Sequence, residues 1–271
     1  MSYASPVPQF GLGTYGRIGP AGLTALETAI EVGYRHFDTA QSYGTEINVG
    51  EAIRRSGLPR SEVFVTTKVA DSNLAGADFM PSVELSLATI DLGPVDLLLI
   101  HWPSEMDRVP LEDYVTALAE AQQRGLTRMI GVSNFPVALL ERTEALLGPG
   151  AIVTNQVEIH PYLQAPRLTA FARSRGVMLT AYQPLAKGEV GGDPVLGRIA
   201  GAQGVTAAAV ALAFLMAEGH AVIPASSTEA NLRANFAARD VSLSPDEIAE
   251  IRRLDRGYRR IHPAKAPRWD D

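Results

Sequence analysis

The sequence predicts one (β/α)8 barrel that takes in the whole chain, residues 1–271. Eight short apolar runs, often rich in β-branched residues, recur along the chain, as buried strands do. The segments between them place apolar residues at helical spacing, and 271 residues suffice for one barrel domain. Strand and helix alternating eight times predict a parallel sheet with helical crossovers. An open doubly wound sheet is the alternative that the same alternation allows.

The expected strands follow one another at regular intervals. In order they are FGLGT (10–14), HFDT (36–39), VFVTTK (63–68), VDLLLIHW (95–102), RMIGVSN (128–134), IVTNQV (152–157), VMLTAY (177–182) and AVIPAS (221–226). Helical spacing starts near Leu23 and is clear in residues 111–125 and 136–148; Ser133 and Asn134 are candidate caps for the latter. The longest apolar stretch, 206–219, is too short to cross a bilayer and predicts a buried helix.

The segment GLGTYG (11–16) matches the dinucleotide fingerprint G-x-G-x-x-G, and Asp38 follows its last glycine by 22 residues. That fingerprint needs a strand directly before the glycines and a helix directly after them. Here two prolines interrupt the preceding strand, and RIGPAGL (17–23) stands where the helix should run. We therefore interpret the match as false for a Rossmann fold.

Composition excludes several classes of function. The formal net charge is -6 and the isoelectric point is about 5.4, which argues against sequence-independent binding to nucleic acid. There is no cysteine, so disulfides and thiolate metal sites are excluded, and no H-x-H pair or carboxylate cluster indicates a metallohydrolase. The N-terminal segment lacks the features of a signal peptide. We expect a cytoplasmic protein with no membrane partner, either a monomer or a weak oligomer.

The expected strands end in polar residues. In chain order these are Thr14, Asp38, Lys68, His101, Ser133, Asn134, Gln156, Tyr182 and Ser226. Parallel strands of a barrel all end at the same rim, and active sites of such barrels are built there. Any one of these residues alone would also fit a strand that simply meets water. Their recurrence on all eight strands predicts one site.

Four residues near these strand ends suggest a chemistry. A buried pair of Lys68 and Asp38 beside Tyr43 is expected to lower the pKa of that tyrosine from about 10. Tyr43 would then donate a proton to a carbonyl oxygen. His101 could hydrogen-bond the same oxygen. Packing or solvent-exposed roles remain open for each, because spacing alone does not show that they converge.

Six segments, in order, carry a resemblance to a known family. They are GYRHFDTAQSYGTE, VTTKV, LLLIHWP, IGVSNF, TNQVEIHPYLQ and AYQPLA, and the chain resembles the aldo-keto reductase family over nearly its whole length. TNQVEIHPYLQ, VIPASSTEANLRANF and the tail PAKAPRWDD look most like the bacterial 2,5-diketo-D-gluconate reductase B branch, which also reduces methylglyoxal.

The resemblance implies NAD(P)H-dependent reduction of a carbonyl to an alcohol. Small aldehydes, 2-oxoaldehydes such as methylglyoxal, and keto-sugar acids such as 2,5-diketogluconate are the implied substrates. It implies a catalytic tetrad of Tyr43, Asp38, Lys68 and His101, with Tyr43 as proton donor, and substrate contacts from Tyr43, His101 and Trp102. The implied cofactor contacts are Gly13, Thr14, Asp38, Ser133, Asn134, Gln156, Tyr182, Gln183, Leu185, Ser226, Ser227 and Asn235.

This sequence departs from the family in two places. Ala225 and Asn231 replace a lysine and an arginine that commonly hold the 2′-phosphate of NADP, so NADPH is expected but NADH stays open. Ala70 replaces a tryptophan that usually walls the substrate pocket, which predicts a wider pocket unless Trp102, Trp269 or a loop fills it. The alternative function is a cofactor-binding regulatory or interaction protein on the same scaffold. The intact tetrad weighs against it.

Overall fold

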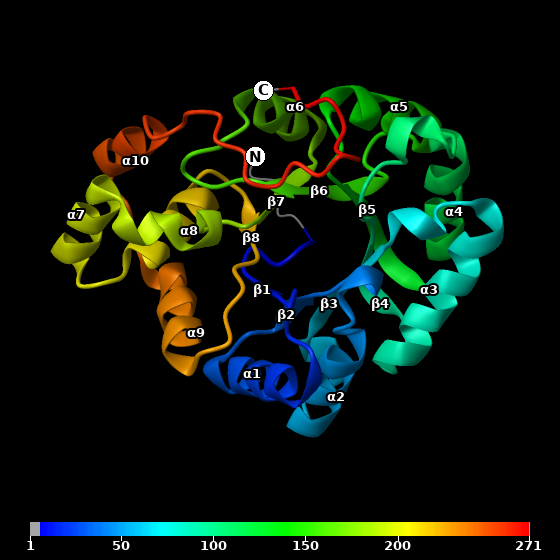
Figure 1. Cartoon of the computed structure of the whole chain (residues 1–271), viewed down its shortest axis with the longest axis horizontal. Coiled ribbons are helices and arrows are strands. Elements are labelled where there is room, and N and C mark those ends of the chain that lie inside the picture. Colours follow the sequence, from blue (N-terminus) through cyan, green and yellow to red (C-terminus); the bar gives the residue numbers. More distant parts are fainter. Residues whose placement is uncertain (1–5, 271) are drawn as a thin grey trace.

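The structure is a computed structural model that describes residues 6–270, and it shows eight parallel strands encircled by helices (Figure 1). The strands, each paired with the next in sequence, are β1 (Leu12–Gly13), β2 (His36–Asp38), β3 (Phe64–Val69), β4 (Val95–Ile100), β5 (Thr127–Ser133), β6 (Ile152–Glu158), β7 (Met178–Tyr182) and β8 (Ala221–Val222). The helices are α1 (Gly19–Val32), α2 (Glu46–Ser56), α3 (Gly76–Ile90), α4 (Leu111–Gln123), α5 (Val137–Leu147), α6 (Pro166–Arg175), α7 (Pro194–Gln203), α8 (Ala207–Ala217), α9 (Glu229–Phe236) and α10 (Pro245–Arg252).

The sheet closes on itself between β8 and the segment that leads into β1. The backbone N–H groups of Gly11 and Gly13 donate to the carbonyls of Val222 (2.9 Å) and Pro224 (3.1 Å), and Val222 donates to Gln9 (2.9 Å). Strand β8 is short because Pro224 has no N–H for the ladder. The (β/α)8 prediction is confirmed, and the open doubly wound alternative is wrong.

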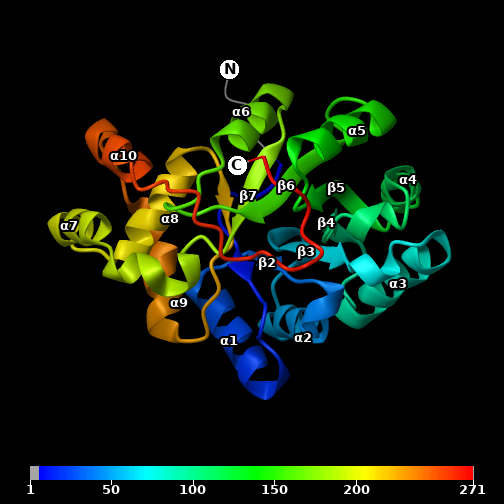
Figure 2. The same ribbon diagram turned by 45° about the horizontal axis from the view of Figure 1, so that its top comes forward.

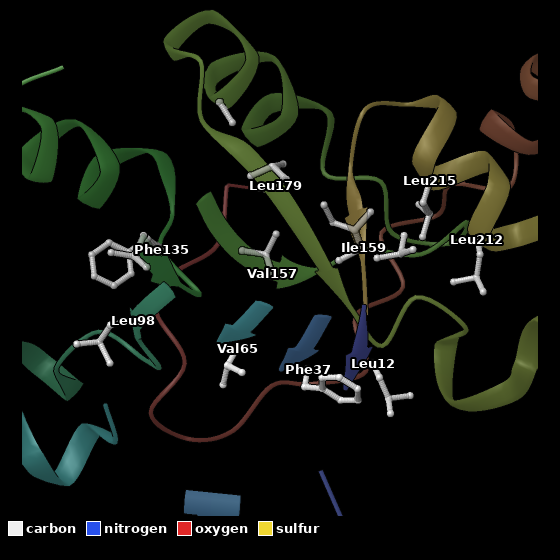
Figure 3. Close-up of a cluster of buried hydrophobic side chains, with 14 of the residues drawn as sticks. Leu12, Phe37, Val65, Leu98, Phe135, Val157, Ile159, Leu179, Leu212 and Leu215 are labelled. Carbon is white, nitrogen blue, oxygen red and sulfur yellow. The ribbon is translucent and has the colours of Figure 1, made fainter. Parts of the chain in front are cut away.

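Two apolar layers hold the barrel, because successive strand side chains point to opposite faces. Phe37, Val65 and Leu98 belong to the large cluster between strands and helices (Figure 3). Leu97 and Leu99 face the other way and form a smaller cluster with Val7 inside the barrel. The polar rim residues described below share that inward face; Lys68, for example, is the register partner of Leu99.

Each glycine of GLGTYG has a local reason that involves no nucleotide. A Cβ on Gly11 would lie 2.7 Å from the His36 ring, and one on Gly13 would lie 2.9 Å from the Ile223 carbonyl oxygen. Gly16 has a φ of +78°, in the left-handed region. Because these glycines belong to a closed barrel, the interpretation of the fingerprint as a false match for a Rossmann fold is confirmed.

Helix α1 begins at Gly19, four residues before the predicted start near Leu23. Pro20 lies in its first turn, where a missing N–H costs nothing, so the proline that looked like a helix breaker starts the helix. The helices predicted at 111–125, 136–148 and 206–219 are α4, α5 and the largely buried α8. No single helix in residues 6–270 is long and apolar enough to cross a membrane; α7 and α8 pass that test only as a pair bent by 95°.

Candidate active site

The predicted strand-end residues meet at one end of the barrel. At several strand ends the backbone just past the strand hydrogen-bonds to the end of the neighbouring strand. The Thr14 N–H donates to the Asp38 carbonyl (3.0 Å), and the Asn134 N–H donates to the Gln156 carbonyl (3.0 Å). The N–H of His101 donates to the carbonyl of Val69 at the end of β3 (3.1 Å). These bonds hold the side chains of different strands in one ring.

Lys68 and Asp38 form an ion pair inside the barrel, with side chains 0% and 2% exposed. The Lys68 ammonium also donates to the Thr39 carbonyl (2.8 Å), and the Gln156 amide donates to the second carboxylate oxygen of Asp38 (2.7 Å). Burial alone would lower the pKa of Lys68. The Asp38 carboxylate and the Tyr43 hydroxyl together raise it by more than burial lowers it, so the pKa of Lys68 lies above its usual value. The Lys68 ammonium therefore stays charged in the core.

Tyr43 and His101 approach each other beside that pair. Tyr43 ends the short 3-10 helix Gln41–Tyr43 after β2, and its hydroxyl lies 3.3 Å from His101 Nε2. The Lys68 Nζ lies 4.9 Å from the centroid of the tyrosine ring. Burial, and then Lys68 and Lys265, lower the pKa of His101 well below 6.5, so this imidazole is neutral at neutral pH. The convergence of Asp38, Tyr43, Lys68 and His101 is thus a feature of the structure.

The expected direction of the Tyr43 pKa is wrong. Burial raises the pKa of Tyr43 above 10.0 by more than the neighbouring Lys68 lowers it. The sequence revealed the lysine charge but not the depth at which the phenol lies. As a result Tyr43 is protonated at neutral pH.

The ends of β5, β6 and β7 carry a second network. The Ser133 hydroxyl donates to the Gln156 carbonyl (2.7 Å), and the Asn134 amide donates to the His101 carbonyl (2.9 Å). The Tyr182 hydroxyl donates to the Asn134 side-chain oxygen (2.8 Å). Asn134 adopts a φ of +64°, which lets its short side chain turn back over the rim. Amide, hydroxyl and aromatic groups are therefore fixed next to the tetrad.

Ser133 and Asn134 do not cap α5, contrary to expectation. The N-cap residue of α5 is Pro136, with no side-chain cap hydrogen bond. Ser133 and Asn134 are engaged within the rim, and the N–H of Val137 instead donates to the Asp270 carboxylate (2.8 Å). The cap is thus supplied by the C-terminal tail, far away in sequence.

The remaining predicted cofactor residues lie after β7 and β8. Ser226 and Asn235 are buried and Ser227 is exposed, while Gln183 and Leu185 belong to a turn in which Gln183 has a φ of +51°. Two cations lie on this side of the rim. The Arg233 guanidinium is paired with Glu229 (2.8 Å), and the Arg17 Nε donates to the Ser226 carbonyl (3.1 Å). Ala225 is exposed and uncharged, as is Asn231.

Sequence reasoning missed how the C-terminal tail, residues 255–270, covers the rim (red in Figures 1 and 2). Two backbone N–H groups of the tail, from Arg260 and Ile261, donate to the buried Glu158 carboxylate (2.7 and 2.8 Å). Trp269 packs edge-on against Trp102, with ring centroids 6.3 Å apart. Side chains along a strand alternate between its two faces, so Glu158 lies on the same face as Gln156. That alternation would have indicated Glu158 as a rim residue from the sequence.

Comparison with known proteins agrees with this geometry. The profile of the Aldo/keto reductase family matches residues 20–256. Methylglyoxal reductase DkgB of Escherichia coli O157:H7 is 43% identical over 265 residues, covering 97% of this chain and 99% of that protein. Aldo/keto reductase slr0942 of Synechocystis sp. is 35% identical, covering 96% of this chain and 89% of that protein.

Solved structures give the same assignment. A crystal structure described as a candidate 2,5-diketo-D-gluconic acid reductase B superposes with a TM-score of 0.94 at 42% identity, covering 98% of this chain and 94% of that chain. The aldose reductase of Schistosoma japonicum superposes with a TM-score of 0.89 at 28% identity, covering 96% of this chain and 95% of that chain. The resemblance seen in the sequence motifs is thereby confirmed. The chain belongs to the aldo/keto reductase family of oxidoreductases, which use nicotinamide cofactors.

Proposed function

We propose that the protein is an NADPH-dependent carbonyl reductase with Tyr43 as its proton donor. Its proposed substrates are small aldehydes, 2-oxoaldehydes such as methylglyoxal, and keto-sugar acids such as 2,5-diketogluconate. The observation that carries the proposal is the approach of the Tyr43 hydroxyl to His101 Nε2 (3.3 Å) beside the buried ion pair of Lys68 and Asp38. Similarity to methylglyoxal reductase DkgB supports the substrate class.

Each side chain near the proposed carbonyl position has a separate proposed role. A carbonyl oxygen within reach of both Tyr43 and His101 accepts hydrogen bonds from the phenol and from the neutral imidazole. Tyr43 gives its proton to that oxygen as negative charge develops there. The Lys68 ammonium, held by Asp38, stabilises the phenolate that remains. Asn134 fixes the His101 backbone through its amide.

The donor set beside the tetrad fits a nicotinamide group. Ser133, Asn134 and Gln156 offer the hydroxyl and amides that a carboxamide needs, and Tyr182 offers a flat ring at the end of β7. When bound, the reduced cofactor supplies a hydride to the carbonyl carbon. We propose that Gln183, Leu185, Ser226, Ser227 and Asn235 hold its pyrophosphate and adenosine half, and that Gly13 and Thr14 lie near the nicotinamide.

The test is the loss of reduced-nicotinamide absorbance with methylglyoxal, run with NADPH and NADH in parallel. Oxidation of NADPH in the presence of methylglyoxal, and not in its absence, is the expected result. Turnover with NADH alone would overturn the cofactor assignment. Cofactor binding by fluorescence without turnover on methylglyoxal or 2,5-diketogluconate would favour the alternative, a regulatory binding protein. We further propose that the protein is cytoplasmic and is a monomer or a weak oligomer. Gel filtration, which gives its apparent molecular mass, tests the oligomeric state.

A further inference from the structure

Lys265 reaches from the C-terminal tail to the rim beside the tetrad. Its ammonium lies 2.5 Å from an Asp71 carboxylate oxygen and 5.8 Å from the centroid of the Trp102 ring. Asp71 follows Ala70, which stands where the family usually places a bulky tryptophan. The Lys265 side chain is 30% exposed, so a ligand can reach it.

The ammonium of Lys265 has hydrogen-bonding capacity to spare. It carries three N–H donors, and within residues 6–270 Asp71 is the single acceptor that the structure gives it. Burial, Lys68 and then Lys265 lower the pKa of His101, which places the Lys265 charge within electrostatic reach of that imidazole. A spare donor and a positive charge thus lie by the Trp102 ring, within electrostatic reach of His101.

The whole tail is positively charged in an otherwise acidic protein. Residues 255–270 contain five Lys or Arg residues and two Asp residues, whereas the chain as a whole has a formal net charge of -6. A basic segment over the mouth of a site attracts anionic ligands and raises their local concentration. The charge of the cover therefore matches an acidic substrate.

We propose that Lys265 selects carbonyl substrates that also carry a carboxylate, by binding that carboxylate beside His101 and Trp102. This inference rests on the proposed reductase function and narrows its substrate class to oxo acids. A different role, in which Lys265 only latches the tail through Asp71, predicts the opposite response to loss of Asp71. Without Asp71 a latch is broken, whereas a carboxylate-binding ammonium is released for substrate.

Two aldehydes of nearly equal size separate these roles: 4-carboxybenzaldehyde, which is anionic, and 4-nitrobenzaldehyde, which is neutral. We expect Lys265→Met to lower the ratio of kcat/KM for the carboxy over the nitro compound about tenfold, chiefly through KM. Asp71→Asn should raise that ratio. Arg268→Met is the matched control, since it removes one charge from an exposed position of the same tail and should leave the ratio within about twofold.

The inference is overturned if Lys265→Met leaves the ratio unchanged, or if Asp71→Asn lowers it as Lys265→Met does. Raising the salt concentration should shrink the effect of Lys265→Met, because the charge is partly exposed. Failure of the wild-type protein to oxidise NADPH or NADH with 4-nitrobenzaldehyde, methylglyoxal or 2,5-diketogluconate would overturn the reductase function itself. Reduction of both benzaldehydes by wild type and Lys265→Met in the same ratio would overturn the role of Lys265 alone.

Discussion

The two sides of the barrel rim differ in where their charges lie. At the ends of β2 to β4, Lys68 and Asp38 form a buried pair that no single substitution can remove without leaving a charge unpaired. At the β8 side, Ala225 and Asn231 stand where the family commonly has cations, in exposed positions. Exposed charges contribute little to folding, so they can be lost at small cost. The side with the buried pair, which is the proposed reacting side, is therefore constrained by stability, whereas the proposed adenosine side is free to vary.

Breaking the buried pair should have the largest effect. Lys68→Met leaves the Asp38 carboxylate unpaired inside the barrel, and we expect the free energy of unfolding to fall by about 3–5 kcal/mol. Reductase turnover should fall by about 10²–10⁴-fold, because the phenolate of Tyr43 loses its cation. Urea denaturation and the steady-state assay measure the two losses. A double variant, Lys68→Met with Asp38→Asn, is the control and should recover part of the stability but not the turnover.

Restoring positive charge on the β8 side of the rim should increase the preference for NADPH over NADH. We expect Ala225→Lys with Asn231→Arg to tighten NADPH binding by about tenfold or more, since each cation adds a charge-assisted contact to the 2′-phosphate. NADH has no 2′-phosphate, so its Kd should stay within about twofold and serves as the internal control. Quenching of protein fluorescence gives both constants. Equal tightening for the two cofactors would show that these positions do not face the 2′-phosphate.

The pH profile tests the protonation states on the reacting side. The pKa of His101 is lowered well below 6.5, so the imidazole is neutral at pH 6.5, and the pKa of Tyr43 is raised above 10.0, so the phenol is protonated up to about pH 9. We therefore expect kcat/KM for methylglyoxal to be flat from about pH 6.5 to about pH 9. A midpoint of activity loss between those limits would show that one of these groups titrates there. The same profile measured on the residual activity of Tyr43→Phe would identify whether Tyr43 or His101 titrates.

Loosening the tail should have the smallest effect. The N–H groups of Arg260 and Ile261 each donate to a different carboxylate oxygen of Glu158. Glu158→Gln keeps an oxygen for one of these N–H groups but places an amide N–H donor against the second. We expect KM to rise about threefold with kcat little changed, because the tail covers the site without touching the proton transfer. Steady-state kinetics and limited proteolysis of the tail report this. Glu218→Gln, which breaks the surface pair with Arg252, is the control.

The fold was predictable because local patterns determine it. The eight apolar runs and their helical spacers define strands and crossovers without any long-range information, and even the strand-end polar residues follow from the chain. The start of α1 was not predicted, since Pro20 reads as a breaker in sequence and acts as a first-turn residue in the helix.

The missed features depend on contacts between residues far apart in sequence. The cap of α5 comes from Asp270, the anchor of the tail is Glu158, and the pKa of Tyr43 depends on how deeply the folded chain buries it. No window of the sequence contains both partners of such contacts. Motif resemblance indicated the tetrad, but not which contacts hold the basic tail across the barrel rim (Figure 2).

The most direct test of the central claim compares wild type with Tyr43→Phe in NADPH-dependent reduction of methylglyoxal, with cofactor binding measured on the same samples. We predict that kcat falls by about 10²–10⁴-fold while the Kd for NADPH stays within about threefold, because the phenol supplies the proton and does not hold the cofactor. Retention of most of the turnover by Tyr43→Phe would contradict the account, since some other group would then be the proton donor.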